Sequence, residues 1–114
     1  TEISAVSAHG TGTTHNDTME LAAFHTLLGD RPVPVYSIKG ATGHTIGAAG
    51  GIEVALATEV LQTGTALPTV GFQEPESGAE GKVSSKAVAF DGQYILTCNS
   101  GFGGINAAII LKRA

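Results

Sequence analysis

The sequence predicts an α/β fold, in which helices pack on a mixed β-sheet. Three observations lead to this fold class. Short runs of small and β-branched residues predict buried strands. Two longer segments between such runs have the composition of helices, so the expected order is strand, helix, strand, helix and then three strands. Several of these strands end in loops rich in glycine and threonine, which suggests that the loops present functional groups.

The first strand and helix follow from local patterns near the start of the chain. Residues 3–7 predict a buried strand. Residues 16–30 predict a helix, in which Asp17 and Glu20 have the spacing of a capping box and Gly29 suits a C-terminal cap. The core-facing side of this helix is an apolar stripe: Leu21, Phe24 and Leu28.

The middle of the chain predicts a strand, a helix and a connection. "VPVYSIK", residues 33–39, predicts a short strand after a proline turn. Residues from about 47 to 61 predict a helix that is apolar nearly all round and therefore buried on most sides. Residues 63–86, with two prolines and several Gly and Glu, predict an exposed connection.

The C-terminal part predicts strands only. Residues 86–100 predict a hairpin around Asp91-Gly92, because Asp-Gly is a strong hairpin turn. Residues 105–113, "INAAIILKR", predict a final buried strand. No internal repeat is found.

Composition narrows the class of protein. The 114 residues are 42% apolar and 14% charged, which is typical of one globular domain. The net charge of -4, without a basic stripe, argues against nucleic acid as a partner. No apolar run approaches the ~20 residues of a membrane helix, and no signal peptide pattern opens the chain. A single cysteine, Cys98, excludes an internal disulfide, so we expect a cytoplasmic protein with no membrane partner.

Three unusual loops follow predicted strands, at residues 9–17, 39–47 and 98–106. In open α/β sheets, ligands bind beyond the carboxyl ends of the strands. We therefore expect these loops to meet at one edge of the sheet. They would bring together His9, His44, Lys39, several hydroxyl groups and a Gly-Phe-Gly-Gly turn. That combination predicts a functional site.

Other kinds of site fit the sequence less well. Neither "GATGHT" nor "GFGGIN" has the spacing of a nucleotide-binding glycine loop. The four histidines lack metal-site spacing, so no metal is expected. His25, on the flank of a helix, is interpreted as structural. Cys98 leads into a glycine loop rather than a helix N-terminus that would lower its pKa, and it is also interpreted as structural.

The three loops together resemble motifs in the C-terminal part of the β-ketoacyl synthases, the elongating condensing enzymes of fatty acid and polyketide synthesis. The resemblance covers nearly the whole chain, with motifs in the same order and at the same spacing. It implies part of the C-terminal half of a thiolase-like fold, a mixed sheet layered with helices. The matching motifs are H-G-T-[GS]-T with N-D-x-x-E at His9 to Thr13 and Asn16 to Glu20, K-x-x-x-G-H-x-x-G-A-A-G at Lys39 to Gly50, and G-F-G-G-x-N at Gly101 to Asn106.

The resemblance implies catalytic roles for three residues. His9 and His44 would donate N–H groups to an enolate that develops on a thioester oxygen, and His9 would assist decarboxylation. Lys39 would line the same site and pair with Glu53, since an unpaired buried carboxylate is costly. A solvated Glu53 is the alternative. The Gly/Ala-rich start of the second helix would let it pack tightly where the halves of the fold meet.

The resemblance also implies how substrates are held. Thr11 and Thr13 would bind the pantetheine arm of the substrate. The backbone N–H of Phe102 would contribute to an oxyanion hole, and its ring would gate the acyl pocket within the loop of Gly101, Phe102 and Gly103. No cofactor is implied, because the substrates are carried on the phosphopantetheine of acyl carrier protein, the expected partner.

The resemblance covers only the end of a longer family pattern with two similar halves. We therefore expect residues 1–114 to form an incomplete C-terminal ketosynthase domain, without the N-terminal half that carries the nucleophilic cysteine. A strand and a helix are expected before Thr1, and their absence would leave a sheet edge unpaired and the helix that starts near Gly47 partly uncovered. Either the chain is a fragment or a second chain completes it. The full enzyme is expected to be a homodimer.

Some positions depart from the family pattern, and alternative functions remain. Thr14 and His15 replace a usual Pro-Leu, Ser100 stands where an aromatic residue often precedes the gate, and Ile105 replaces Thr. Because of the last two departures, the resemblance does not specify the details of the gate or of the acyl pocket. A non-catalytic subunit of the chain-length-factor type is the main alternative, although such subunits tend to lose the first histidine motif, which is intact here. A stand-alone binding module is a weaker one.

Overall fold

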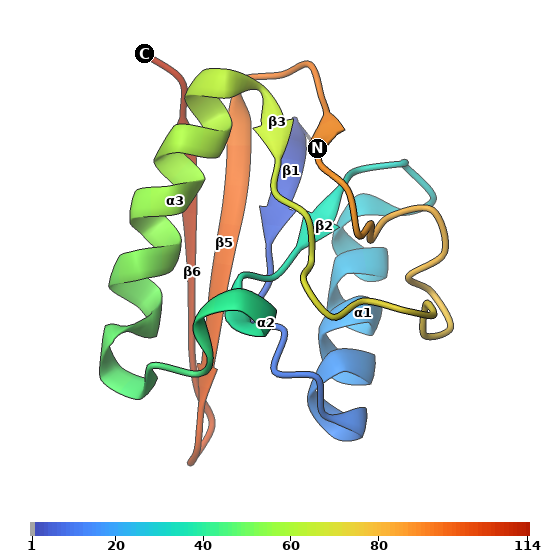
Figure 1. Ribbon diagram of the computed structural model, residues 1–114, viewed down its shortest axis with the longest axis vertical. Coiled ribbons are helices and arrows are strands. Elements are labelled where there is room, and N and C mark those ends of the chain that lie inside the picture. Colours follow the sequence, from blue (N-terminus) through green and yellow to red (C-terminus); the bar gives the residue numbers. More distant parts are fainter. Residues whose placement is uncertain (1) are drawn as a thin grey trace.

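The computed structural model describes residues 2–114 and contains a four-stranded sheet, shown in Figure 1. The strand order is β2-β1-β5-β6. β1 is parallel to β2 and to β5, whereas β5 and β6 are antiparallel, so the predicted mixed sheet is confirmed. These strands are β1 (Ile3–Ser7), β2 (Val35–Tyr36), β5 (Tyr94–Gly101) and β6 (Ile105–Lys112).

Two long helices lie on opposite faces of this sheet, α1 (Thr14–Leu28) and α3 (Ala49–Thr63) (Figure 1). Successive residues of a strand point to opposite faces, so each strand supplies two cores. Val6 belongs to the cluster that packs against Phe24 of α1. Its neighbour Ala5 belongs to the cluster that packs against Ala57 of α3. The result is a three-layered α/β arrangement, as the sequence predicts.

The remaining elements are short. Helix α2 (Lys39–Thr42) follows β2, and the 3₁₀ helix η1 (Ile46–Ala48) leads into α3. β3 (Thr65–Ala66) and β4 (Val88–Ala89) form a small antiparallel sheet of their own. Most residues between them are exposed and irregular, as expected for the connection. None of the helices within residues 2–114 is long and apolar enough to cross a membrane.

The expected capping box of α1 is wrong. The helix begins at Thr14, with Thr13 as the N-cap and no side-chain cap bond. Asp17 lies in the first turn, where its Oδ1 accepts a hydrogen bond from the Gly12 N–H at 3.2 Å. Glu20 binds the backbone of the loop after β1 instead of the helix start. That loop folds back over α1. Its backbone N–H groups therefore donate to the two carboxylates that the sequence pattern assigned to the N-terminal cap of the helix.

The hairpin expected around Asp91-Gly92 is also wrong. β4 pairs with β3, while β5 pairs with β1 and β6, so the turn carries the chain from the small sheet into the main one. Gly92 is required there because an added Cβ would lie 1.7 Å from the Ser4 hydroxyl oxygen. The hairpin that does form joins β5 to β6 through residues 102–104. Gly103 and Gly104 both have positive φ in this turn, which glycine adopts readily.

Burial at the end of the chain also differs from expectation. β6 is a strand, but it is exposed rather than buried, and Ile105 and Ile110 are largely open. It is the last strand of the sheet, and among residues 2–114 only α3 packs on it, where Leu111 joins the core cluster. For the same reason α3 is buried along one side only, rather than on most sides. β1 lies inside the sheet with a neighbour on each side, so the edge strands are β2 and β6, and the outer N–H of Val35 in β2 donates to the Lys82 carbonyl at 2.9 Å.

Candidate active site

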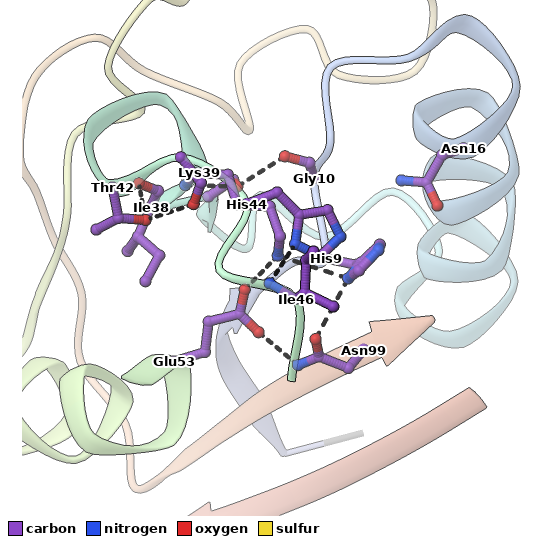
Figure 2. Close-up of polar contacts among 12 residues, drawn as sticks. His9, Gly10, Asn16, Ile38, Lys39, Thr42, His44, Ile46, Glu53 and Asn99 are labelled. Atoms are coloured by element: carbon purple, nitrogen blue, oxygen red, sulfur yellow. Dashed lines mark hydrogen bonds and ion pairs between the residues drawn. The ribbon is translucent and has the colours of Figure 1, made fainter. Parts of the chain in front are cut away.

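The loops after β1 and β2 meet the end of β5 at one edge of the sheet. β1, β2 and β5 run parallel, so their carboxyl ends lie at the same edge. His9, just after β1, is the meeting point (Figure 2). Its Nδ1 lies 3.3 Å from Oδ1 of Asn99 on β5 and 3.5 Å from Nζ of Lys39, which begins α2. The predicted convergence of the loops after β1 and β2 with the end of β5 is confirmed.

The expected ion pair between Lys39 and Glu53 is present. Glu53 Oε1 accepts from Lys39 Nζ, and the two residues are 1% and 8% exposed respectively. The alternative of a solvated Glu53 is therefore wrong. Glu53 lies on the buried side of α3, and its carboxylate is the contact of that helix with Lys39. The two buried charges are in direct contact and compensate one another, so the loss of either side chain leaves an unpaired buried charge.

Asn99 is a site residue that the sequence interpretation missed. Its Nδ2 donates to Oε2 of Glu53, while its Oδ1 faces Nδ1 of His9 (Figure 2). The amide therefore links the ion pair to the imidazole. Asn99 lies within the third predicted loop, so its position was visible in the sequence. Nothing in the local pattern, however, showed which groups it would contact.

Glu20 and Ser37 were missed as well, and both hold the loop after β1 in place. The buried Glu20 carboxylate accepts from the backbone N–H groups of His9 at 2.8 Å and Gly10 at 2.7 Å. Asn16 Nδ2 donates to the same carboxylate at 2.8 Å. Ser37 Oγ donates to the Gly10 carbonyl at 2.9 Å from the side of β2. These contacts orient the backbone that presents His9.

His44 lies beside His9, as predicted. The ring centroids are 5.4 Å apart and the planes are nearly perpendicular, at 84°. Nδ1 of His44 accepts a hydrogen bond from the Ile46 N–H at 3.2 Å, so in the neutral ring the proton is on Nε2. Ile46 has a φ of +52°, a strained conformation for a β-branched residue, which is typical of functional sites. His44 is thus set to act as an N–H donor through Nε2.

A cavity of about 780 Å³ opens beside these residues. Thr11, Thr13, Lys39 and His44 all contribute to its wall, and the hydroxyl oxygens of the two threonines lie 3.0 Å apart. His9 is buried and is not among the residues that line this cavity, but its ring contacts that of His44, which does line it. Within residues 2–114, no three His, Cys, Asp or Glu side chains are grouped as metal ligands. The cavity is large enough for an extended small-molecule group and offers it hydroxyls, an ammonium group and an imidazole.

The structure does not bring Phe102 to the cavity. Its ring is 105% exposed, and neither Phe102 nor Gly101 nor Gly103 lines the cavity wall. The loop is the tip of the β5–β6 hairpin and extends past the sheet edge (Figure 1). This differs from the expected gate. The reason is that residues 102–104 form a glycine-rich reverse turn with nothing among residues 2–114 to pack against.

Cys98 has the surroundings of a structural residue. It lies in β5 opposite Ala108 and packs against the core cluster under α1. Burial, with smaller contributions from the charges of Glu20 and Glu53, raises the pKa of its thiol to about 11. Because the thiolate is the nucleophilic form, Cys98 is poorly suited to nucleophilic chemistry near neutral pH.

Gly40 fixes the start of α2, and we expect Gly40→Ala to destabilise the protein. An added Cβ would lie 1.8 Å from the Val70 carbonyl oxygen, so backbone must move, at a cost of about 1–3 kcal/mol. Gly51→Ala is the matched control, because a Cβ there meets no atom within 4 Å. Urea denaturation of both variants measures the difference. Equal midpoints would show that Val70 does not confine Gly40.

Comparison with known proteins gives the family. The fold and site define a layered α/β protein with a histidine, lysine and glutamate cluster at the carboxyl edge of its sheet. Residues 1–73 match the model of the β-ketoacyl synthase C-terminal domain. The chain therefore belongs to the β-ketoacyl synthase family.

Curated relatives and solved structures agree with this assignment. The chain is 39% identical to the tetracenomycin polyketide synthase ketoacyl synthase alpha subunit of Streptomyces glaucescens, over 95% of this chain and 26% of that protein. It is 36% identical to 3-oxoacyl-[acyl-carrier-protein] synthase 2 of Vibrio harveyi, over 99% of this chain and 28% of that one. A β-ketoacyl synthase structure from Burkholderia phymatum STM815 superposes with a TM-score of 0.91 at 33% identity, covering 99% of this chain and 28% of that chain.

The chain thus spans about a quarter of the length of these relatives. Solved neighbours also include a type II polyketide synthase acyl carrier protein in complex with its ketosynthase, with a TM-score of 0.88, 27% identity and coverage of 99% of this chain and 28% of that chain. Another neighbour is a ketosynthase/chain length factor, so acyl carrier proteins and partner chains are found with members of the family.

Proposed function

We propose that this chain is the C-terminal part of a β-ketoacyl-acyl-carrier-protein synthase that acts in fatty acid or polyketide synthesis. The observation that carries the proposal is the meeting of His9 and His44 beside the buried Lys39–Glu53 pair, at the edge where three parallel strands end. The names of the relatives support the same reaction class.

The reaction is a decarboxylative Claisen condensation. The malonyl thioester loses carbon dioxide, and the electrons of the broken C–C bond form an enolate with its charge on the thioester oxygen. The enolate carbon attacks the carbonyl of an acyl group held on a cysteine, and the cysteine thiolate leaves. N–H groups aimed at the enolate oxygen lower the barrier. The Nε2–H of His44 and an N–H of His9 are the proposed donors, and His9 assists the decarboxylation.

The other parts of the site follow from the same proposal. Thr11 and Thr13, in the cavity wall, bind the pantetheine arm of acyl carrier protein, so no separate cofactor is needed. The loop of Gly101, Phe102 and Gly103 forms the oxyanion hole and gate once the rest of the synthase packs against it. The nucleophilic cysteine comes from outside these 114 residues. The complete enzyme is proposed to be a cytoplasmic homodimer; the cytoplasmic assignment rests on its low cysteine content in this segment.

A chain-length-factor-type subunit is the second candidate, because a ketosynthase/chain length factor is among the similar structures. The intact His9-Gly-Thr-Gly-Thr motif favours the catalytic subunit. The full-length protein, incubated with an acyl- and a malonyl-acyl carrier protein, should form a 3-ketoacyl thioester that mass spectrometry detects. Formation of product only after addition of a separate ketosynthase subunit would instead identify a chain-length-factor subunit.

Cys98 should be dispensable for this activity. We expect Cys98→Ser to leave condensation by the full-length protein within about twofold of wild type, because the buried thiol is neutral at working pH. We also expect the isolated 114-residue chain to form no product, since the nucleophile is absent. Product formed by the isolated chain and lost in Cys98→Ser would make Cys98 the nucleophile. Product that survives the change would overturn the proposed division of roles.

A further inference from the structure

Nδ1 of His9 has two partners that make opposite demands. Asn99 Oδ1 lies 3.3 Å away and Lys39 Nζ lies 3.5 Å away. Both distances exceed the ~2.9–3.0 Å that is commonest for N–H···O hydrogen bonds. One ring nitrogen has a single hydrogen-bonding position, so it can serve only one of these partners at a time.

The orientation of the Asn99 amide follows from its second contact. Nδ2 donates to Oε2 of Glu53, and an ionised carboxylate can only accept. The acceptor Oδ1 must therefore face His9. The Lys39 ammonium group is a donor only. Asn99 thus requires a proton on Nδ1 of His9, whereas Lys39 requires a bare nitrogen there.

These opposite requirements correspond to two states of the imidazole. With Lys39 donating to Nδ1, the neutral ring carries its proton on Nε2. With Nδ1–H donating to Asn99, the ring is either the neutral Nδ1–H tautomer, in which Nε2 is bare, or an imidazolium, in which both nitrogens carry protons. Nε2 has no hydrogen-bond partner among residues 2–114, and it carries a proton in the neutral state that accepts from Lys39 and in the imidazolium that donates to Asn99.

We propose that Asn99 is a positioning residue for His9. It takes over from Lys39 as the partner of Nδ1 when the ring gains a second proton, so that the imidazolium keeps the orientation and the Nε2–H of the neutral ring. The inference rests on the proposed function, in which His9 donates an N–H group to the enolate. Asn99 itself touches no reacting atom.

The charges around His9 suit this exchange of partners. Lys39 faces the ring from α2, and Glu53 from α3 binds both Lys39 and Asn99. Glu20 of α1 holds the His9 backbone N–H, and His44 meets the ring edge to face. Glu53 accepts from both Lys39 and Asn99, so the same carboxylate holds the donor and the acceptor that face Nδ1 of His9.

A double-mutant cycle in the full-length protein tests the role. We expect Asn99→Ala to slow decarboxylation of malonyl-acyl carrier protein about tenfold, the value of about one hydrogen bond, and to change acylation of the nucleophilic cysteine less than about twofold. In a His9→Ala background the same change should have no further effect, because Asn99 acts through His9. Gln93→Ala, an exposed amide just before β5, is the matched control and should leave both rates unchanged. Equal slowing by Asn99→Ala in both backgrounds overturns the proposal.

Nitrogen-15 NMR of histidine-labelled full-length protein gives a readout that does not depend on activity. The His9 signals are assigned by their loss in His9→Ala. Asn99→Ala should shift the signals toward an unprotonated Nδ1, and unchanged signals would overturn the role of Asn99. If Asn99→Ala does not fold, Asn99→Asp is measured instead. It keeps the acceptor oxygen and should shift the His9 signals toward a protonated Nδ1, and unchanged signals in this variant would also overturn the role of Asn99. A wild-type protein that forms no product would overturn the proposed function while leaving this NMR result to decide on Asn99.

Discussion

His9→Ala and His44→Ala should each lower the rate of condensation by the full-length protein by about 10²–10³-fold, the usual effect of removing one oxyanion donor. The physical reason is that the centroids of the two rings lie 5.4 Å apart at the sheet edge, and that His44 lines the cavity in which we propose the substrate binds. Steady-state formation of the 3-ketoacyl thioester measures the loss. His44 is held as an Nε2–H donor by the Ile46 N–H, so alanine removes a group that is already oriented.

Two controls separate a chemical effect from a structural one. Acylation of the nucleophilic cysteine should change far less than condensation, because the donors proposed for that step are backbone N–H groups. His25→Ala removes a histidine whose side chain is 65% exposed on α1, and it should have no effect. Acylation that falls as much as condensation would contradict the assignment of the two histidines to the enolate.

Glu53→Ala should destabilise the protein by about 3–5 kcal/mol, since it leaves the buried Lys39 ammonium without its counter-charge. The change also removes the carboxylate that Asn99 Nδ2 binds, so the half-buried Asn99 amide loses its acceptor as well. Chemical denaturation of the full-length protein measures the free energy of unfolding.

Glu59→Ala is the matched control for this prediction. Glu59 lies on the same helix, α3, but on its exposed side, so its loss should change the free energy of unfolding by less than about 0.5 kcal/mol. Similar effects of the two changes would mean that the Lys39–Glu53 pair contributes no more than a surface charge does.

Much of the fold could be predicted, because its elements depend on local patterns. β1 is as apolar and buried as residues 3–7 indicate, and α1 ends at Gly29 as expected. The errors concern pairing over longer distances. Asp91-Gly92 has the composition of a hairpin turn, yet β4 finds its partner in β3. Turn propensity is a local quantity and does not specify which strands a turn connects.

Burial at the end of the chain could not be predicted for a related reason. The apolar residues of β6 predict a strand that is suited to burial. They do not specify whether the surface that buries it belongs to this chain. Exposed apolar strands at a sheet edge favour association with another surface. The exposure of Phe102 at the neighbouring hairpin tip has the same physical origin.

The Lys39–Glu53 contact could be predicted because a buried charge requires an opposite charge beside it. A buried glutamate in an apolar helix requires a counter-charge, and the resemblance to the β-ketoacyl synthases assigned that role to Lys39. The role of Asn99 was not predictable, because a neutral amide accepts and donates equally well and leaves no requirement visible in the sequence. Glu20 was assigned to a helix cap because that is the usual use of its spacing, whereas the loop backbone took it instead.

The most direct test follows the carboxyl carbon of the malonyl group. The full-length protein is supplied with an acyl-acyl carrier protein and malonyl-acyl carrier protein labelled with carbon-13 in the free carboxyl group. We expect one labelled carbon dioxide for each 3-ketoacyl thioester formed, and loss of both products together in a variant that lacks His9 and His44. A 3-ketoacyl product that retains the label, or release and condensation that continue at full rate without the two histidines, would contradict the account.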